Sequence, residues 1–152
     1  MLPRKSRYGK GTRRALAGTA ALEFGLAIPF LAILVTGIVE IGFSMYQAMQ
    51  VTYAAEAGLA YAAKNGWDST GITNAAVNST GLSGMSVAPT QFCGCPAASG
   101  LTTATCGTTC TSGNEAGQYI KISVSLTRKS IVGTTGFGLP SAVSAQAILR
   151  QN

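Results

Sequence analysis

The stretch Phe24-Gly-Leu-Ala-Ile-Pro-Phe-Leu-Ala-Ile-Leu-Val-Thr-Gly-Ile-Val39 decides the fold, because it is apolar along its whole length and carries no charge. As a helix it is ~24 Å long, a little short of the ~30 Å hydrocarbon core of a bilayer. A membrane span must therefore extend beyond it, and either extension includes a glutamate, Glu23 or Glu40. We predict a transmembrane helix over residues 19–45.

The basic residues are concentrated before this stretch. Six of the eleven Lys and Arg residues lie in the first fourteen positions: Arg4, Lys5, Arg7, Lys10, Arg13 and Arg14. From residue 15 onward five basic and five acidic side chains balance, so the formal net charge of +6 belongs to the N-terminal segment. The positive-inside rule then predicts a cytoplasmic N-terminus and export of everything beyond about residue 45. A nucleic-acid partner is not expected, because the excess basic residues are confined to the N-terminal segment and do not form a basic surface on the rest of the protein.

The overall composition excludes two broad classes of protein. With 47% hydrophobic and only 11% charged residues among 152, the chain does not have the composition of a disordered tail. The absence of histidine excludes enzymes that depend on imidazole for acid–base or metal chemistry. The sequence shows no Ser/His/Asp set, no paired-carboxylate site and no phosphate-binding glycine loop. We therefore expect no enzymatic activity and no cofactor.

Residues 13–24, Arg-Arg-Ala-Leu-Ala-Gly-Thr-Ala-Ala-Leu-Glu-Phe, resemble the class III leader of type IV pilin-like proteins. The variant is similar to TadE-like minor pseudopilins of the tight-adherence (Flp) pilus system. Further matches are Pro29, the segment Gly-Ile-Val-Glu-Ile-Gly at 37–42, Ala-Ala-Glu-Ala-Gly at 54–58, the cysteine arrangement and a C-terminal strand ending in Arg150. Leu59 departs from the pattern, because an arginine often follows the glycine there.

The resemblance implies removal of a basic leader, residues 1–18. A prepilin-type membrane aspartic peptidase would cut between Gly18 and Thr19 at the cytoplasmic face, leaving Glu23, followed by Phe24, as the fifth residue of the mature chain. The implied location is the bacterial inner membrane, with the C-terminal domain periplasmic or extracellular. The implied partners are that peptidase, other pilin-like subunits and the pilus assembly machinery. Cleavage by ordinary signal peptidase beyond the span is the alternative.

The two glutamates of the span have different predicted roles. Glu23 would lie at the inner edge of the apolar core, where a carboxylate is unfavourable unless it is paired. In related assemblies it meets the new N-terminal amine of a neighbouring subunit; the alternative is that Glu23 is protonated or reaches the headgroups. Glu40 lies ~26 Å further along the helix, which places it at the outer interface.

We expect an α+β fold for the exported domain, residues 46–152. The helical pattern continues to Lys64, where Asn65-Gly66 is a plausible stop, and a second short helix is predicted over residues 70–82. Strands are predicted over residues 83–92, 118–131 and 141–150. Alternation of Ile120, Ile122, Val124 and Leu126 with polar residues gives the middle strand one apolar face. A small antiparallel sheet of about three strands should pack on the projecting helix through that face.

Four cysteines, Cys93, Cys95, Cys106 and Cys110, lie in a Gly/Thr/Ser-rich loop over residues 93–110. They could bind zinc or form two disulfides. The spacings Cys-x-Cys and Cys-x-x-x-Cys differ from the usual Cys-x-x-Cys metal pair, and an exported loop is in an oxidising space. We therefore predict two disulfides and no metal, with Cys93 and Cys95 each bonded to Cys106 or Cys110.

Two main functional hypotheses follow. The first is a pilin-like structural protein, processed by a prepilin peptidase and needed for assembly of a tight-adherence surface pilus. The second is a single-pass membrane anchor with an exported, disulfide-stapled binding domain, whose glycine and glutamate are coincidental. A thiol redox module is a third, less favoured class, because Cys-Gly-Cys lies in a proline-bounded loop rather than at a helix N-terminus. The mature N-terminus distinguishes the first two.

Overall fold

The computed structural model describes residues 12–98, 100–131, 133 and 138–151. Most of the predicted basic leader, residues 1–11, lies outside this described part. The chain divides into two compact units, Met1–Glu40 and Ile41–Asn152. Helix α1 (Thr12–Asn65) contributes to both units.

The first unit is the N-terminal part of α1, whose side chains from residue 19 onward are mostly exposed. The exposed fractions of Phe24 and Phe30 are 67% and 74%, so the apolar surface has no protein cover there. The helix continues through Pro29, which has no backbone N–H and so removes one helical hydrogen bond. The predicted long helix is confirmed, and it begins before Thr19. The structure adds that the Glu40 side chain is buried.

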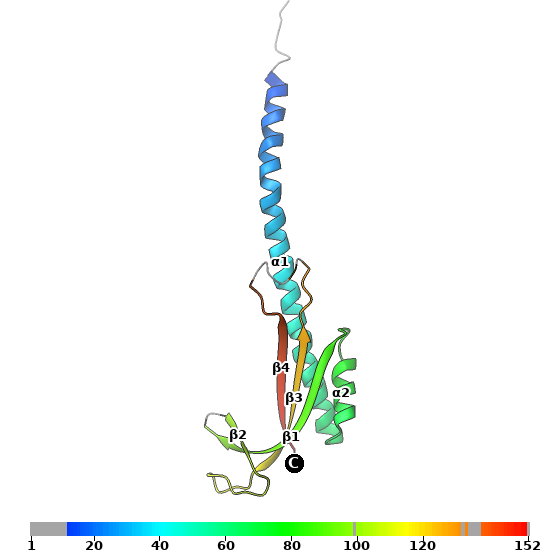
Figure 1. Ribbon diagram of the computed structural model, residues 1–152, viewed down its shortest axis with the longest axis vertical. Coiled ribbons are helices and arrows are strands. Elements are labelled where there is room, and N and C mark those ends of the chain that lie inside the picture. The colour runs from blue at the N-terminus through cyan, green and yellow to red at the C-terminus, as the bar shows by residue number, and fades with distance from the viewer. Residues whose placement is uncertain (1–11, 99, 132, 134–137, 152) are drawn as a thin grey trace, which may run out of the picture. The chain divides into compact units, whose positions relative to one another are not determined.

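The second unit combines the C-terminal part of α1 with a short helix and an antiparallel sheet (Figure 1). The elements after α1 are α2 (Ser69–Asn78), β1 (Met85–Ala97), β2 (Gly100–Ala104), β3 (Gly117–Thr127) and β4 (Ala142–Gln151). In the described part of the chain the four strands form one sheet in the order β2-β1-β3-β4. The α+β class is confirmed.

The sheet has four strands where the sequence predicts about three. Strand β1 does not stop at Phe92 but continues to Ala97, and its last five residues form a hairpin with β2, from Cys93 opposite Ala104 to Ala97 opposite Gly100. The region predicted as a loop thus begins with paired strands, because Thr102 and Thr103 suit a strand and Gly100, at φ 119°, suits the turn. Pro89 is tolerated because this part of β1 pairs with β3 alone.

Strand β3 is also shorter than predicted. It ends at Thr127 rather than Ile131, and just beyond it the backbone N–H of Arg128 donates to the Ser141 carbonyl at 2.9 Å. The helix α2 ends at Asn78 rather than near Leu82, and the Ser79 hydroxyl donates to the Ala76 carbonyl at 2.7 Å. These differences concern boundaries, since each predicted element exists.

The core of the second unit forms where α1 and α2 meet the inner face of β3. Its fully buried large side chains include Ile72 of α2 and Ile120, Ile122 and Val124 of β3, which confirms the predicted apolar face. The helix α1 contributes small residues to this contact, namely Val51, Ala54, Ala55 and Ala62. Small side chains let the helix axis approach the sheet closely, so the alanine-rich segment is the face that packs on the domain.

The connection between the two helices is fixed by a few polar contacts. Gly66, at φ 77°, ends α1 with its N–H donating to the Ala62 carbonyl at 2.9 Å, a left-handed C-terminal cap. The Asp68 carboxylate accepts from the Thr70 N–H at the start of α2 and from the Tyr61 hydroxyl, both at 3.1 Å. The hydrogen bond to Asp68 raises the pKa of Tyr61.

Gly58 is a position of close approach between α1 and the rest of the core. A Cβ there would lie 3.2 Å from Ile122 Cδ1, 3.3 Å from Ala76 Cβ and 3.3 Å from the Ile72 carbonyl oxygen. Gly58→Leu is therefore expected to lower the free energy of unfolding by about 3 kcal/mol, through overpacking. Thermal unfolding in detergent, followed by circular dichroism, measures the effect.

Gly42→Leu is the matched control for this substitution. It lies on the same helix, and a Cβ at Gly42 would meet nothing within 4 Å. The control should be neutral or slightly stabilising, because Gly is about 1 kcal/mol less favourable than Ala in a helix. Equal melting temperatures for the two variants would show that Gly58 is not a close-packing position.

Candidate functional site

The predicted processing and assembly residues lie in the first unit, on one short stretch of α1. Gly18 and Thr19 are both within the helix, so the backbone at the predicted cleavage site is helical. Glu23 follows Thr19 by one turn, and the Glu23 side chain is exposed, as is that of Phe24 at 67%. The stretch thus presents a carboxylate and an aromatic ring on an otherwise apolar helix surface.

Beyond the apolar stretch, α1 carries a second exposed row that the sequence pattern predicts only as helix. Met45, Tyr46, Met49 and Tyr53 are 64%, 46%, 63% and 56% exposed. Tyr46, Met49 and Tyr53, together with Glu56, lie on one open surface of α1. We call Met45, Tyr46, Met49 and Tyr53 the aromatic row. It differs from the row that packs on the sheet, which runs through Val51 and Ala54.

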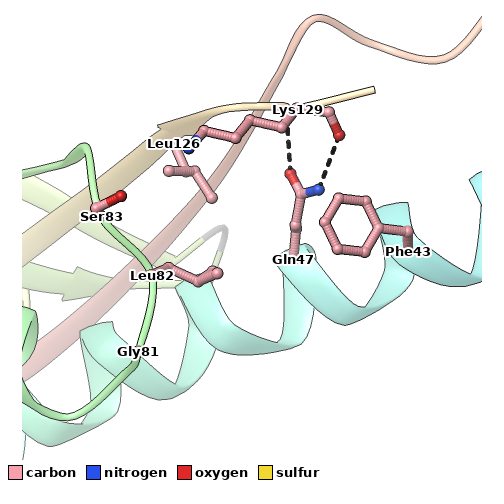
Figure 2. A pocket seen from close by; sticks show the side chains of 7 residues that line it. All are labelled: Phe43, Gln47, Gly81, Leu82, Ser83, Leu126 and Lys129. Atoms are coloured by element: carbon pink, nitrogen blue, oxygen red, sulfur yellow. Dashed lines mark hydrogen bonds between the residues drawn. The ribbon is translucent and has the colours of Figure 1, made fainter. Parts of the chain in front are cut away.

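A polar contact fixes α1 against the end of β3. The Gln47 side chain is buried; its Nε2 donates to the Lys129 carbonyl at 3.0 Å, and its Oε1 accepts from the Lys129 N–H at 3.3 Å. The amide therefore satisfies both backbone groups of Lys129, much as a neighbouring strand would. Figure 2 shows this pair beside a cavity of about 250 Å³. The cavity is lined by Phe43, Gln47, Gly81, Leu82, Ser83, Leu126 and Lys129.

The four cysteines form two disulfides, Cys93–Cys106 and Cys95–Cys110. Cys93 and Cys95 face their partners from the end of β1, whereas Cys106 and Cys110 lie in the segment after β2. The bridges therefore hold that segment to the hairpin, and they interleave along the sequence. Both agree with the prediction that each of Cys93 and Cys95 bonds to one of the later pair. Among the described residues, no group of three or more His, Cys, Asp or Glu side chains is placed to hold a metal ion.

In the described residues, one helix is long and apolar enough to cross a membrane, over Thr19–Asn65. Residues 18–60 match the family model described as TadE-like protein. The resemblance seen in the leader and span is thereby confirmed for that part of α1. No curated protein and no solved structure matches the chain significantly.

Two features of the site were missed by sequence reasoning. Nothing in the sequence distinguishes Gln47 from Gln50, three residues later, so the burial of the Gln47 amide and its hydrogen bonds to Lys129 are seen only in the structure. The aromatic row was assigned to a helix but not to an open face, because a spacing of three and four residues fits a core-facing and a solvent-facing row equally. Only the packing of the alanines on β3 decides between them.

Proposed function

We propose that the chain is a non-catalytic, pilin-like subunit of a tight-adherence surface pilus. It would be cut by a prepilin peptidase between Gly18 and Thr19 and then assemble through α1. The observation that carries this proposal is the TadE-like match over residues 18–60, which begins at the predicted cleavage residue and ends within α1. The family match itself indicates a function related to the tight-adherence pilus.

Processing requires the peptidase to take an extended backbone at a position that is helical before cleavage. Glycine makes this easier, because it is about 1 kcal/mol less favourable than alanine within a helix. The missing Cβ also lets the backbone of Gly18 come close to the catalytic carboxylates of the peptidase. Both properties support Gly18 as the residue before the cut bond.

Cleavage would change the electrostatics of the inner end of the span. It removes all six leader cations and creates an α-amino group on Thr19, which is cationic or nearly so at neutral pH. The exposed Glu23 carboxylate would be unfavourable in lipid without a partner. The cationic Thr19 amine of a neighbouring subunit would supply that partner. This pairing would select processed subunits for assembly.

The aromatic row supports a role in assembly as well. Its side chains leave a large apolar area open on the face of α1 opposite the alanines that pack on β3. Apolar rows of Tyr and Met on one helix face are suited to contact with another helix. We assign this row to the contact with the α1 helix of another pilin-like subunit.

Glu23→Ala tests the assembly role separately from processing. The variant should be cut normally, since the peptidase reads Gly18 and the leader, but it should fail to support pilus formation because the neighbour's amine has no carboxylate to meet. Surface pili would be counted by electron microscopy, and the mature N-terminus determined by mass spectrometry.

Glu115→Ala is the control for Glu23→Ala. Glu115 is also an exposed glutamate, but it lies in the segment between β2 and β3, far along the chain from α1. This control should be processed and should form pili as the wild type does. Normal piliation by Glu23→Ala would remove the pairing role, and an uncut Glu23→Ala chain would show that Glu23 serves the peptidase instead.

The alternative function is a single-pass anchor for an exported binding domain. The disulfide-stapled hairpin would then be the binding element, and α1 would only hold it to the membrane. In that case Gly18 has no special role and the leader stays attached. Determining the first residue of the protein recovered from membranes therefore distinguishes the two functions.

A further inference from the structure

The cavity beside Gln47 lies where α1 leaves the predicted membrane span. Two of its lining residues, Phe43 and Gln47, flank Met45, where the span is expected to end. At 1.5 Å per residue both lie within about 3 Å of that level along the helix axis. If the chain has the proposed single-pass topology, the cavity therefore opens at the depth of the lipid headgroups.

The wall of the cavity has an apolar part and a cationic part. Phe43, Leu82 and Leu126 supply the apolar surface. The Gln47 amide is already used by the Lys129 backbone, so the other polar side chains among the lining residues are those of Ser83 and Lys129. In the view of Figure 2 the Lys129 side chain extends from its hydrogen-bonded backbone toward Leu126. The exposed Lys129 thus adds a positive charge beside apolar surface.

We propose that this cavity binds an anionic phospholipid of the leaflet on the exported side. Its phosphate would meet the Lys129 ammonium and the Ser83 hydroxyl, and its upper acyl carbons would contact Phe43, Leu82 and Leu126. The volume of about 250 Å³ is below the ~300 Å³ at which pockets for complete small ligands begin, so only this part of the lipid enters. Charge complementarity and position together favour a lipid over an apolar side chain of another protein.

The binding would give the exported unit a defined contact with the membrane surface. Gln47 fixes the Lys129 backbone to α1 through two hydrogen bonds, so a lipid held by the Lys129 side chain stays within the reach of that side chain from a fixed point of the helix. The proposal rests on the proposed function only for the topology. The cavity itself lies wholly within the unit Ile41–Asn152 and does not depend on cleavage.

The test uses the full chain in detergent micelles and native mass spectrometry. Phosphatidylglycerol and phosphatidylcholine with identical acyl chains are titrated separately, and the lipid retained per protein is counted. The wild type should retain phosphatidylglycerol in preference. Lys129→Gln should weaken its retention about fivefold, the factor that corresponds to ~1 kcal/mol for one cation near an anionic lipid surface.

Two matched controls distinguish an effect at the cavity from the loss of a positive charge elsewhere and from the addition of a large side chain elsewhere. Lys121→Gln removes the same charge from β3 and should leave retention unchanged. Ser83→Trp should fill the cavity and abolish the preference, whereas Ser86→Trp, at an exposed position of β1, should not. Melting temperatures confirm that all four variants are folded.

Several results would overturn the proposal. Equal retention of the two lipids by the wild type would show that the cavity does not select an anionic lipid. The cavity would then be assigned to a side chain of another subunit. An equal effect of Lys121→Gln and Lys129→Gln would show non-specific attraction to the net charge. The chain with its leader and the chain beginning at Thr19 should retain lipid equally, so an error in the processing proposal cannot be mistaken for a failure of lipid binding.

Discussion

Gly18→Leu is expected to leave the whole leader attached and to abolish assembly. A leucine side chain at this position would keep the backbone away from the peptidase carboxylates and would also strengthen the helix that has to open. The uncut chain would retain six cations next to the span and would lack the Thr19 amine that Glu23 is proposed to meet. Mass spectrometry of membrane protein should therefore give one species, longer than the wild type by residues 1–18.

Gly25→Leu is the control for this substitution. It places the same side chain on the same helix, where a Cβ would meet nothing within 4 Å. Gly25→Leu should be processed as the wild type is. A Gly18→Leu chain recovered with the wild-type N-terminus would show that the peptidase cuts elsewhere.

Removal of a disulfide is expected to cause a large loss of stability. Removal of either bridge should destabilise the exported unit by ~3 kcal/mol in the chain-entropy model, because the bridges close loops with sequence separations of 13 and 15 residues. The four Cys→Ser variants should form two groups, Cys93 with Cys106 and Cys95 with Cys110. Members of one group should have similar melting temperatures, and the double variant of a group should resemble its single variants.

Thiol alkylation gives an independent measurement of the same pairing. The wild type should be blocked until a reductant is added and should then gain four adducts, since it contains no free cysteine. Cys93→Ser leaves the exposed Cys106 and should react quickly, whereas Cys106→Ser leaves the buried Cys93 and should react slowly. Free thiols in wild-type protein quenched with acid would contradict both the bridges and the export of residues 93–110.

Much of this fold could be predicted because its signals are local. The apolar stretch from Phe24, the left-handed cap at Gly66 and the alternation along β3 each depend on neighbouring residues. The hairpin of β1 and β2 lies where the sequence predicts a loop, since its Gly and Thr content does not distinguish a turn-rich loop from two short paired strands. Beyond the early end of β3, the backbone of Lys129 is hydrogen-bonded by Gln47, which is 82 residues away in the sequence and belongs to another element.

The candidate site could be predicted less completely than the fold. Gly18, Thr19 and Glu23 were identified from a short linear motif, and the TadE-like match begins at the first of them. The aromatic row and the cavity beside Gln47 arise from how α1 packs, since one side of the helix is covered by β3 and the other is not. Such features depend on long-range contacts, which a single sequence does not specify.

The central claim is that this chain is a processed pilin-like subunit anchored by α1. The most direct measurement is the intact mass and N-terminal residue of the wild-type protein recovered from membranes. A chain that begins at Thr19 and carries both disulfides is the predicted result. A chain that still carries residues 1–18, or one cut beyond the apolar stretch so that α1 no longer spans the membrane, would contradict the claim.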